Sequence, residues 1–277
     1  MNKEDAKKLT DQAFGELEDA LKAGHSDRLK RYLDVMGRFH KYSFGNCLLI
    51  LIQMPDATQV AGFRRWLELG RHVRKGESGI GIIAPLVYRK RDDSSQEDSE
   101  GAALRGFKVV HVFDISQTDG DDLPELGGIA GEPGELLIGL ETLIRESGIG
   151  LKYEELPPGT KGVSFKGEIA VAVELPAAER FAVLSHELAH EWLHDAVQRK
   201  ELSKTVRETE AEAVSYVVCR AFGLDCSTRS ADYIQMYQGT AQTLTESLDR
   251  IQKTAMRIIE SLNAPRNAAK EGTRHVA

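Results

Sequence analysis

A His-Glu-X-X-His motif, formed by His186, Glu187 and His190, lies in a stretch without glycine or proline, residues 181–195. Apolar residues in this stretch recur at the spacing of one helical face, which predicts a helix. Residues four apart share a helical face, so the two imidazoles can reach one metal ion. Glu187 is then placed to take a proton from water at that ion. The motif predicts a zinc site that hydrolyses amide bonds; the alternative is an amphipathic helix with two surface histidines.

A catalytic zinc ion takes three protein ligands and leaves a fourth position for water. His194 lies four residues beyond His190, but a straight helix rarely wraps three such side chains round one ion, and no glycine turn intervenes. We therefore expect His194 to line the pocket or to support a ligand. Glu208 and Glu212 are four apart in the next predicted helix, residues 205–216. We expect Glu208 to bind the metal and Glu212 to hold a ligand histidine by its second ring nitrogen.

The reverse assignment of Glu208 and Glu212 is left open, and Glu210 is expected to point elsewhere. Taken alone, this run of glutamates is also typical of a solvated helix start, where acidic side chains favour the N-terminal dipole. Zn2+, one ion per chain, is the expected metal, because two imidazoles, one carboxylate and an open water position favour it. Mn2+, Co2+ or Ni2+ could replace it.

The chain has 277 residues, room for two domains or one large one, and a formal net charge of -7. No apolar run approaches the roughly 20 residues that a membrane span needs, so no membrane partner is expected. Residues 1–8 are polar and lack the apolar core of a signal peptide. Three cysteines without CxxC spacing, Cys47, Cys219 and Cys226, predict free thiols in a reducing compartment. These features favour a cytoplasmic location.

Residues 62–91 carry eight basic side chains and two acidic ones, against the acidic balance of the whole chain. Three aromatic residues, Phe63, Trp66 and Tyr88, are interleaved with them. Basic side chains along a groove neutralise phosphates, and aromatic faces stack unpaired bases whatever their sequence. The segment is therefore a candidate face for single-stranded nucleic acid. The alternative is that Phe63 and Trp66, three apart, are core anchors of a short helix.

Periodicity and turn residues predict the organisation of the rest of the chain. In the first half we expect helices over residues 3–21, 25–39, 46–53 (capped by Ser43) and 62–69, and strands over residues 79–89 and 107–113 around a mobile acidic loop, residues 92–105. In the second half we expect a helix over residues 135–147, a β-meander over residues 153–174 with strands 162–165 and 168–174, the two metal helices, and a helical tail over residues 231–262. The predicted fold class is α+β with two domains, residues 1–117 and 135–264, a linker, residues 118–134, and a disordered tail, residues 265–277.

The predicted meander lies directly before the metal helix, where it bears on the chemistry. In zinc peptidases an extended substrate typically lies antiparallel along an exposed edge strand. Residues 168–174 are the expected edge, and they would hold a peptide carbonyl against the zinc. Zinc polarises that carbonyl and lowers the pKa of its water, while Glu187 shuttles a proton to the leaving amine.

Several short segments of the first half resemble the N-terminal domain of ArdC-type antirestriction proteins. They are residues 42–46, 53–55, 57–58, 62–63, 66, 70–71, 73, 75–77 and 112–114. The second half, with residues 186–190 and 208–213, resembles the zinc-peptidase domain of those proteins and of the IrrE/ImmA group. The resemblance covers roughly residues 25–262, in the same domain order.

This resemblance implies a mixed α/β domain that binds single-stranded DNA without sequence preference, followed by a zincin-like, gluzincin-type metallopeptidase domain. It also supports Glu208 as the third ligand. ArdC-type proteins protect plasmid DNA entering a recipient cell from restriction, and IrrE/ImmA relatives act on transcriptional repressors. The expected partners are single-stranded DNA and a protein or peptide substrate. The residues expected to contact DNA are Tyr42, Asn46, Arg64, Arg65, Trp66, Arg71, Arg74 and Lys75.

Three functions fit these features. The first is an antirestriction-type protein that combines single-stranded DNA binding with zinc-dependent hydrolysis of peptide bonds. The second is a DNA-binding protein whose metal site is structural or regulatory. The third is a regulatory peptidase that cleaves a transcriptional repressor and whose N-terminal domain recognises protein. Substituting Glu187 separates the first two, and reversing the charges of Arg71 and Lys75 tests the DNA-binding face.

Overall fold

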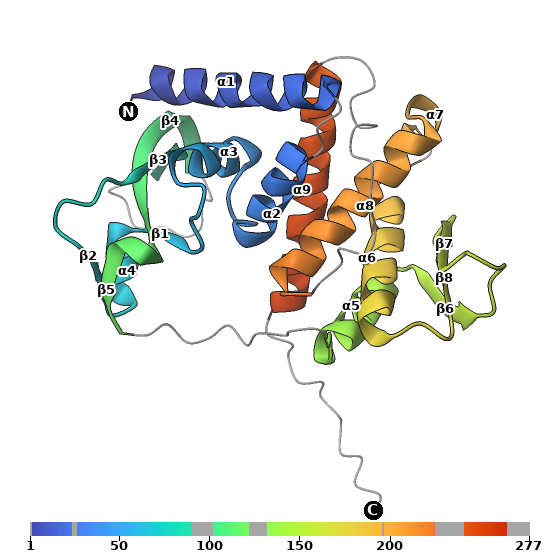
Figure 1. Ribbon diagram of the computed structural model, residues 1–277. Coiled ribbons are helices and arrows are strands. Elements are labelled where there is room, and N and C mark those ends of the chain that lie inside the picture. Colours follow the sequence, from blue (N-terminus) through green and yellow to red (C-terminus); the bar gives the residue numbers. More distant parts are fainter. Residues whose placement is uncertain are drawn as a thin grey trace, which may run out of the picture.

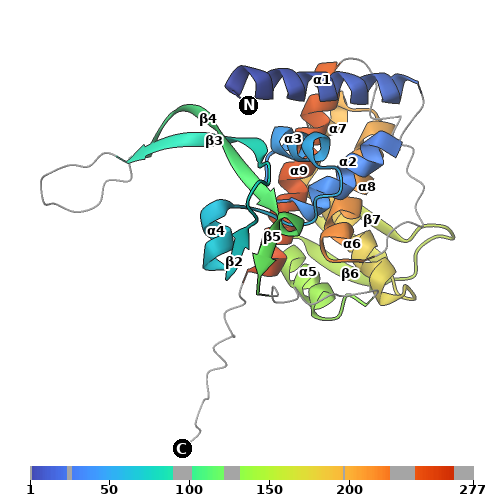
Figure 2. The ribbon, with the colours of Figure 1, turned by 60° about the vertical axis from the view of Figure 1, so that its left-hand side comes forward.

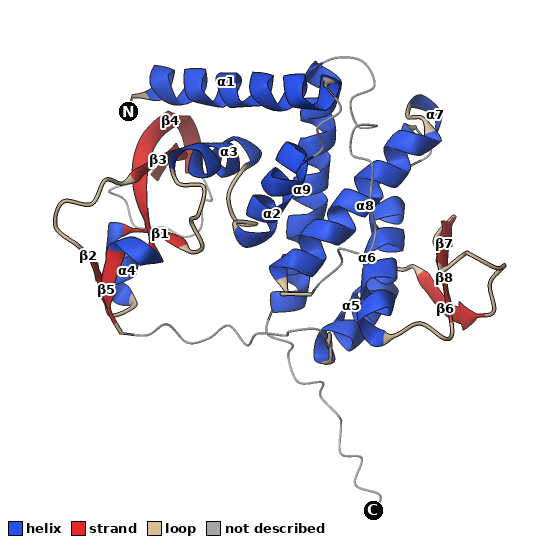
Figure 3. Cartoon of the chain, in the orientation of Figure 1, coloured by secondary structure: helices blue, strands red, loops and turns tan. Residues whose placement is uncertain are grey.

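The computed structural model of the chain describes residues 2–23, 27–89, 102–121, 132–195, 197–224 and 241–264. Helices lie at the centre, and two groups of strands lie on opposite sides of them (Figure 3). The N-terminal half contains α1 (Lys3–Lys22), α2 (Asp27–Arg38), α3 (Phe44–Gln53), β1 (Val60–Gly62), α4 (Phe63–Glu68), β2 (Arg71–Val73), β3 (Ile80–Arg89), β4 (Ala102–Asp114), η1 (Ile115–Gln117) and β5 (Thr118–Gly120). The C-terminal half contains α5 (Glu135–Glu146), β6 (Gly150–Glu154), β7 (Gly162–Phe165), β8 (Glu168–Ala172), α6 (Ala177–Leu193), α7 (Gln198–Glu201), α8 (Lys204–Ala221) and α9 (Ala241–Asn263). The predicted mixture of helices and strands is confirmed.

The first sheet is antiparallel and has the order β1-β4-β3. Its two long strands, β3 and β4, form a hairpin that extends away from the helices (Figure 2). Helix α3 covers the outer edge of β3. The Asn46 amide pairs with the N–H and the C=O of Ile83, at 2.8 Å each, and the Gln53 amide pairs in the same way with Gly81, at 2.9 Å each. Two amide side chains on one helix thus satisfy part of a strand edge that would otherwise need another strand.

One buried carboxylate, that of Asp114, fixes the end of β4 through hydrogen bonds. Asp114 accepts hydrogen bonds from the N–H groups of Thr58, Gln59 and Ser116, at 2.7, 2.9 and 3.0 Å. The N–H of Asp114 in turn donates to the side chain of Gln117 at 2.9 Å. These bonds join the segment before β1 to the end of β4 and to η1.

The second sheet has the order β6-β8-β7, with β7 antiparallel and β6 parallel to β8. The turn between β7 and β8 places Lys166 and Gly167 at φ values of 51° and 82°, the left-handed conformation that a two-residue hairpin turn requires. The predicted hairpin is confirmed. The predicted meander is wrong because β6 runs parallel to β8. The predicted edge strand, residues 168–174, is also wrong: β8 is the central strand, and β7 is an edge.

Helices from the two halves pack into one hydrophobic core. Helix α2 lies against α8, and α9 contacts α1, α3, α5, α6 and α8 (Figure 1). Where α2 meets α8, Tyr216 donates a hydrogen bond to Asp34 at 2.7 Å, and Arg220 pairs with the same carboxylate at 3.0 Å. The division into domains 1–117 and 135–264 stays a prediction, and the core between them is continuous.

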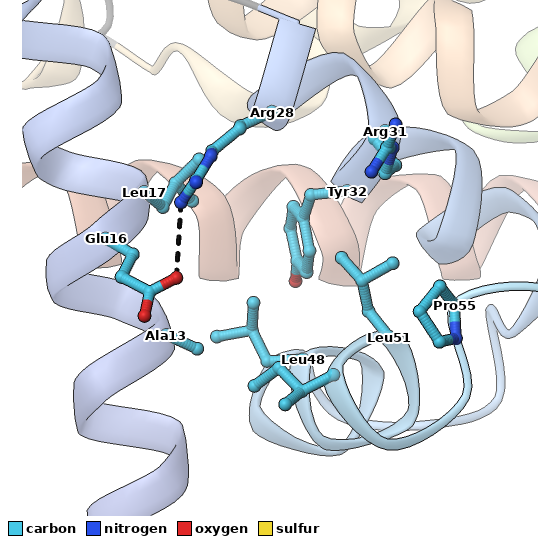
Figure 4. Close-up of a pocket in the computed structure, with 10 residues that line it drawn as sticks. Ala13, Glu16, Leu17, Arg28, Arg31, Tyr32, Leu48, Leu51 and Pro55 are labelled. Carbon is cyan, nitrogen blue, oxygen red and sulfur yellow. Dashed lines mark hydrogen bonds and ion pairs between the residues drawn. The ribbon is translucent and has the colours of Figure 1, made fainter.

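A cavity of about 300 Å³ lies between α1, α2 and α3 (Figure 4). Its wall is largely aliphatic and includes Leu48 and Leu51, together with the ring of Tyr32. At its margin, Arg28 of α2 pairs with Glu16 of α1 at 3.2 Å. Exposed ion pairs contribute little to stability, so α1 is held here mainly by the apolar contacts round the cavity.

Several predicted boundaries change. Residues 102–105 belong to β4, which shortens the predicted acidic loop, and residues 118–120 pair with β2, which moves the start of the predicted linker. The rest of the loop, most of the linker and the predicted tail, residues 265–277, lie outside the described residues. No helix in the described part of the chain is both long enough and apolar enough to cross a membrane.

The cysteines differ from the prediction of three free thiols. Cys47 is a free, buried thiol, and burial raises its pKa to about 12. Cys219 is disulfide-bonded, so the prediction is wrong for this residue. Cys226 lies outside the described residues. Cys47 is therefore a thiol of low reactivity.

We expect Gly37→Val to destabilise the protein by about 1–3 kcal/mol through overpacking. A Cβ at this position on α2 would lie 3.1 Å from Arg220 Cβ and 3.2 Å from the carbonyl oxygen of Val217 on α8. Gly15→Val on α1 is the matched control, because nothing lies within 4 Å of a Cβ there and valine has the better helix propensity at both positions. Urea unfolding measures both variants. Equal stability of the two would contradict the close approach of α2 to α8.

Candidate metal centre and the predicted DNA-binding residues

Three ligand atoms converge where α6 meets α8. His186 and His190 project from α6, one turn apart, and Glu208 projects from α8. The Nε2 atoms of the two histidines are 3.1 Å apart, and Glu208 Oε2 lies 3.5 Å from the first and 3.4 Å from the second. The structure thus brings the three predicted ligands together. Their role as ligands stays a prediction.

The triangle of donor atoms has the size that a tetrahedral ion requires. With metal–ligand distances of about 2.0–2.1 Å, neighbouring ligands of tetrahedral zinc are about 3.4 Å apart. The three separations, 3.1, 3.4 and 3.5 Å, agree with this value. Imidazole and carboxylate donors bind several divalent ions. The residues present therefore fit a divalent metal ion.

Local sequence explains how the two helices present these side chains. Phe181, Leu184 and Leu188 of α6 are fully buried in the core, which turns the opposite face, with the two histidines, towards α8 and β7. The hydroxyl of Ser203 accepts a hydrogen bond from the N–H of Val206 at 3.2 Å and caps the start of α8. This start places Glu208 in the second turn of α8, level with the histidines.

The second ring nitrogen of His186 faces Glu212. Its Nδ1 lies 3.3 Å from Glu212 Oε2, an ion-pair distance, although the two are not aligned as a hydrogen bond. Burial lowers the pKa of His186, but the carboxylates of Glu208 and Glu212 outweigh burial and raise this pKa to about 9. The two histidines hold the pKa of Glu208 well below its usual range. This geometry favours Glu208 over Glu212 as ligand, because only Glu208 approaches both Nε2 atoms.

His190 is supported by a longer chain of contacts. Its Nδ1 lies 3.1 Å from Nδ1 of His194, and Nε2 of His194 lies 3.0 Å from Glu210 Oε2. Burial lowers the pKa of His194, so this imidazole is neutral at pH 7 and has one donor and one acceptor nitrogen. The proton placement that satisfies Glu210 has His194 donating to Glu210 and accepting from His190. It leaves Nε2 of His190 with a lone pair for a metal.

Sequence reasoning missed the role of Glu210. The Glu210 side chain points away from the three ligand atoms, as expected, but it is 0% exposed and is therefore not a solvated surface group. Besides His194, its carboxylate accepts hydrogen bonds from the hydroxyl of Ser247, at 2.5 Å, and from the guanidinium of Arg250, both on α9. Burial raises the pKa of Glu210, and these donors outweigh burial, so the pKa is lowered. Because Arg250 is 40 residues from Glu210, no local pattern could have linked them.

Glu187 lies against β7, one of the two edge strands of the second sheet. A Cβ on Gly162 would come within 2.8 Å of Glu187 Oε1 and 2.5 Å of Val183 Cγ1, so β7 approaches α6 this closely only with glycine at that position. Burial raises the pKa of Glu187, and His186 and His190 partly offset this effect. A glutamate with a raised pKa suits proton transfer near neutral pH.

Three of the residues expected to contact DNA are engaged inside the fold. Trp66 is 1% exposed, and its indole N–H donates to the carbonyl of Phe113 at 2.9 Å. Asn46 is buried and pairs with the backbone of β3. The hydroxyl of Tyr42, which is half-buried, donates to the carbonyl of Val60 at 3.2 Å. Trp66 therefore follows the alternative interpretation, a core anchor, and its ring is not available to stack a base.

The five predicted cations differ in how far they are already paired. Arg71 lies along β5 and donates to the hydroxyl and the carbonyl of Thr118. Arg74 pairs with Glu77 at 2.8 Å and Asp119 at 3.4 Å, and Arg65 pairs with Glu68 at 2.9 Å. Two cations, Arg64 and Lys75, are exposed and form no ion pair with the described residues. Phe63, beside Arg64, is 50% exposed.

The first half of the chain matches a known family of protein domains. Residues 5–113 match the sequence model of a family described as the N-terminal domain of anti-restriction factor ArdC. These residues therefore form a domain of that family, and in its first half the chain is similar to ArdC-type proteins. The match ends before the metal centre and says nothing about the chemistry there.

Solved structures and a curated relative extend the likeness to the whole chain. Two crystal structures of the antirestriction protein ArdC from plasmid R388, one metal-free and one with Mn(II) bound, each cover 92% of this chain and 98% of that protein, with a TM-score of 0.52 and 19% identity. At this identity the likeness shows a shared fold. The uncharacterized protein pXO2-81 of Bacillus anthracis is 27% identical over 94% of this chain and 52% of its own length. The chain thus spans about half the length of the curated relative that it matches.

Substituting Glu208 and Glu210 should separate metal binding from stability. Glu208→Ala is expected to lose the metal with little effect on the metal-free protein, because this side chain is 51% exposed. Glu210→Ala is expected to cost about 1–3 kcal/mol, because it leaves the buried imidazole of His194 and the partly exposed guanidinium of Arg250 without their acceptor. Elemental analysis after incubation with zinc measures the first effect, and chemical unfolding in chelator measures the second. Similar stabilities of the two metal-free variants would contradict the role assigned to Glu210.

The contribution of Glu210 to stability should also depend on pH. Its folded pKa is lowered, so the contribution is fully present above the pKa of an unfolded glutamate, about 4.3, and is lost as pH falls towards the folded value. The stability difference between the parent protein and Glu210→Gln is therefore expected to shrink below about pH 4. A difference that stays constant with pH would mean that folding does not change the pKa of Glu210, and a difference that grows as pH falls would mean that folding raises this pKa.

Proposed function

We propose that this chain is an antirestriction-type protein that combines a zinc-dependent peptidase centre with a domain that binds single-stranded DNA. The observation that carries the proposal is the triangle of ligand atoms from His186, His190 and Glu208, with Glu187 beside it and an edge strand along its margin. The family of the first half supports the antirestriction role.

The residues round the triangle have complementary tasks in hydrolysis. A bound zinc ion would polarise a peptide carbonyl and lower the pKa of a water molecule. Glu187 takes a proton from the attacking water and delivers it to the leaving amine, for which its raised pKa is suited. Glu212 and His194 orient the two imidazoles.

Strand β7 is the element along which a peptide substrate would extend. Its pairing with β8 leaves its other edge without a strand partner among the described residues, and Gly162 and Ser164 line the pocket of the three ligand atoms. An extended peptide that pairs with this edge would bring its carbonyl groups past Glu187. This assigns to β7 the task that the sequence had suggested for residues 168–174.

Glu187→Gln is expected to retain the metal and to lose peptide hydrolysis by about a hundredfold or more, because the proton shuttle is absent. A library of peptides analysed by mass spectrometry before and after incubation measures hydrolysis, and elemental analysis measures the metal. Glu201→Gln on α7, an exposed position, is the control. Hydrolysis by Glu187→Gln at the parent rate would contradict the assignment.

The second candidate, a structural or regulatory metal site, is favoured by the network of Glu210, which ties α6, α8 and α9 together beside the ligands. The same variant separates the two functions. If plasmid DNA is still protected from restriction in cells that contain Glu187→Gln, the metal serves structure or regulation, and hydrolysis is not needed for protection.

For the DNA-binding half we propose that Phe63 stacks an unpaired base while Arg64 and Lys75 contact phosphates. These side chains are exposed, whereas Trp66 and Asn46 serve the fold. Sequence-independent binding of single strands needs such a combination of one aromatic face and unpaired cations.

Phe63→Ala is expected to weaken binding of an unpaired oligonucleotide by about 1–3 kcal/mol, the contribution of one stacked base. Phe165→Ala, equally truncated at an exposed phenylalanine of the other half, should leave the affinity unchanged. Fluorescence anisotropy at several salt concentrations measures both, and Arg64→Ala should also reduce the salt dependence. Unchanged affinity of Phe63→Ala would place the stacking surface elsewhere.

A further inference from the structure

Two arginines line the pocket beside the three ligand atoms. The pocket has a volume of about 160 Å³, and its wall combines β7, the face of α6 with the histidines, Arg199 of α7 and Arg207 of α8. Arg207 directly precedes Glu208 in the chain. The pocket therefore holds carboxylate and imidazole groups for a metal and also guanidinium groups, which have no task in binding a cation.

Arg207 has no acceptor among the described residues. Its Nε is buried and has no hydrogen-bond partner within the described ranges, and the guanidinium forms no ion pair with a described carboxylate. A buried donor without an acceptor costs about 1–3 kcal/mol, and more when it is charged. Such a group in the wall of a pocket is satisfied when a ligand supplies the acceptor.

Arg199 is held in a fixed position at the same pocket. Its Nε donates to the carbonyl of His194 at 2.8 Å, and its Nη2 lies 3.4 Å from Glu191 Oε1. The other carboxylate oxygen of Glu191 accepts from the N–H of Gly167, in the turn between β7 and β8, at 2.9 Å. Glu191 thus joins Arg199 to the edge strand. A guanidinium held in this way loses little freedom when it binds an anion.

We propose that Arg207 and Arg199 form an anion subsite that selects peptides with a carboxylate next to the bond to be cleaved. This inference rests on the proposed peptidase function and names the substrate class of that centre. Guanidinium groups bind carboxylates through paired, charge-assisted hydrogen bonds. The carboxylate is either the side chain of Asp or Glu or the free C-terminus of the substrate, since the two share this chemistry.

The charges of the pocket make the selection specific. Glu187 and Glu208 lie in the same wall, so a ligand carboxylate is repelled except where it meets the arginines. A peptide extended along β7 places alternate side chains on one face of the strand. The residue next to the scissile bond can therefore reach the arginines while its carbonyl lies at the ligand atoms.

Phosphinic pseudopeptides test the subsite by binding, without any need for turnover. They mimic the transition state of peptide hydrolysis and bind a metal through the phosphinate. We compare analogues with Glu or Gln on either side of the phosphinate, and analogues ending in a carboxylate or a carboxamide. Calorimetry with the zinc-loaded protein is expected to show at least about tenfold tighter binding of one carboxylate form. A preference for Glu over Gln identifies the carboxylate as a side chain, and a preference for a terminal carboxylate over a carboxamide identifies it as the C-terminus.

Arg207→Gln is expected to reduce that preference to less than about twofold while leaving the affinity of the uncharged analogue and the zinc content unchanged. Arg207→Lys should retain part of the preference, because charge remains without the paired donors. Arg28→Gln removes an exposed arginine of α2 and is the control for net charge.

Three results would overturn the inference, and each has a different meaning. If the analogues bind but charged and uncharged forms bind equally, the peptidase centre stands and the anion subsite does not. If no analogue binds to protein that retains its zinc, the proposed peptidase function fails and the subsite fails with it. If Arg207→Gln lowers zinc content while the preference persists, Arg207 serves the metal and not the substrate.

Discussion

The hydrogen bonds of the buried carboxylate of Glu210 are the interactions on which the geometry of the candidate metal centre depends. An ionised side chain with no exposure is stable only when donors surround it, and here the donors come from His194, directly after the end of α6, and from Ser247 and Arg250 on α9. Three helices must therefore meet at fixed distances. Glu208 lies two residues earlier on α8 and faces another side of that helix, so the helix held by Glu210 also presents Glu208 to the histidines.

Spacing alone predicts much of this centre. Residues four apart on a helix must share a face, and His186 with His190 and Glu208 with Glu212 follow that rule. The contact of His194 with His190 follows from the same spacing, but the sequence could not predict Glu210 behind His194, because Arg250 reaches Glu210 from a helix 40 residues away. It could not predict the edge strand either. Short alternating segments have similar sequences whether the strand is central or at an edge. The strand order here depends on β6, which is separated from β8 along the chain and pairs with it in parallel.

The first half shows how one pattern can arise from two causes. Aromatic residues among basic ones are typical of a surface that binds single strands, but Trp66 is buried by its packing and by its hydrogen bond to the backbone of Phe113. Asn46 is likewise committed to the edge of β3. Phe63, three residues before Trp66, is half exposed instead. The sequence spacing shows which residues share a face of α4, but only the packing of the rest of the protein decides which face is buried.

The contact of α2 with α8 has a consequence for how such chains diverge. Asp34 binds Tyr216 and Arg220, and Gly37 leaves room for the same helix, so the surface that each half offers to the other is specific in both shape and charge. An exchange of one half for that of a distant homologue would join surfaces that do not match. A chimeric protein is therefore expected to fold only when its α2 and α8 come from the same parent.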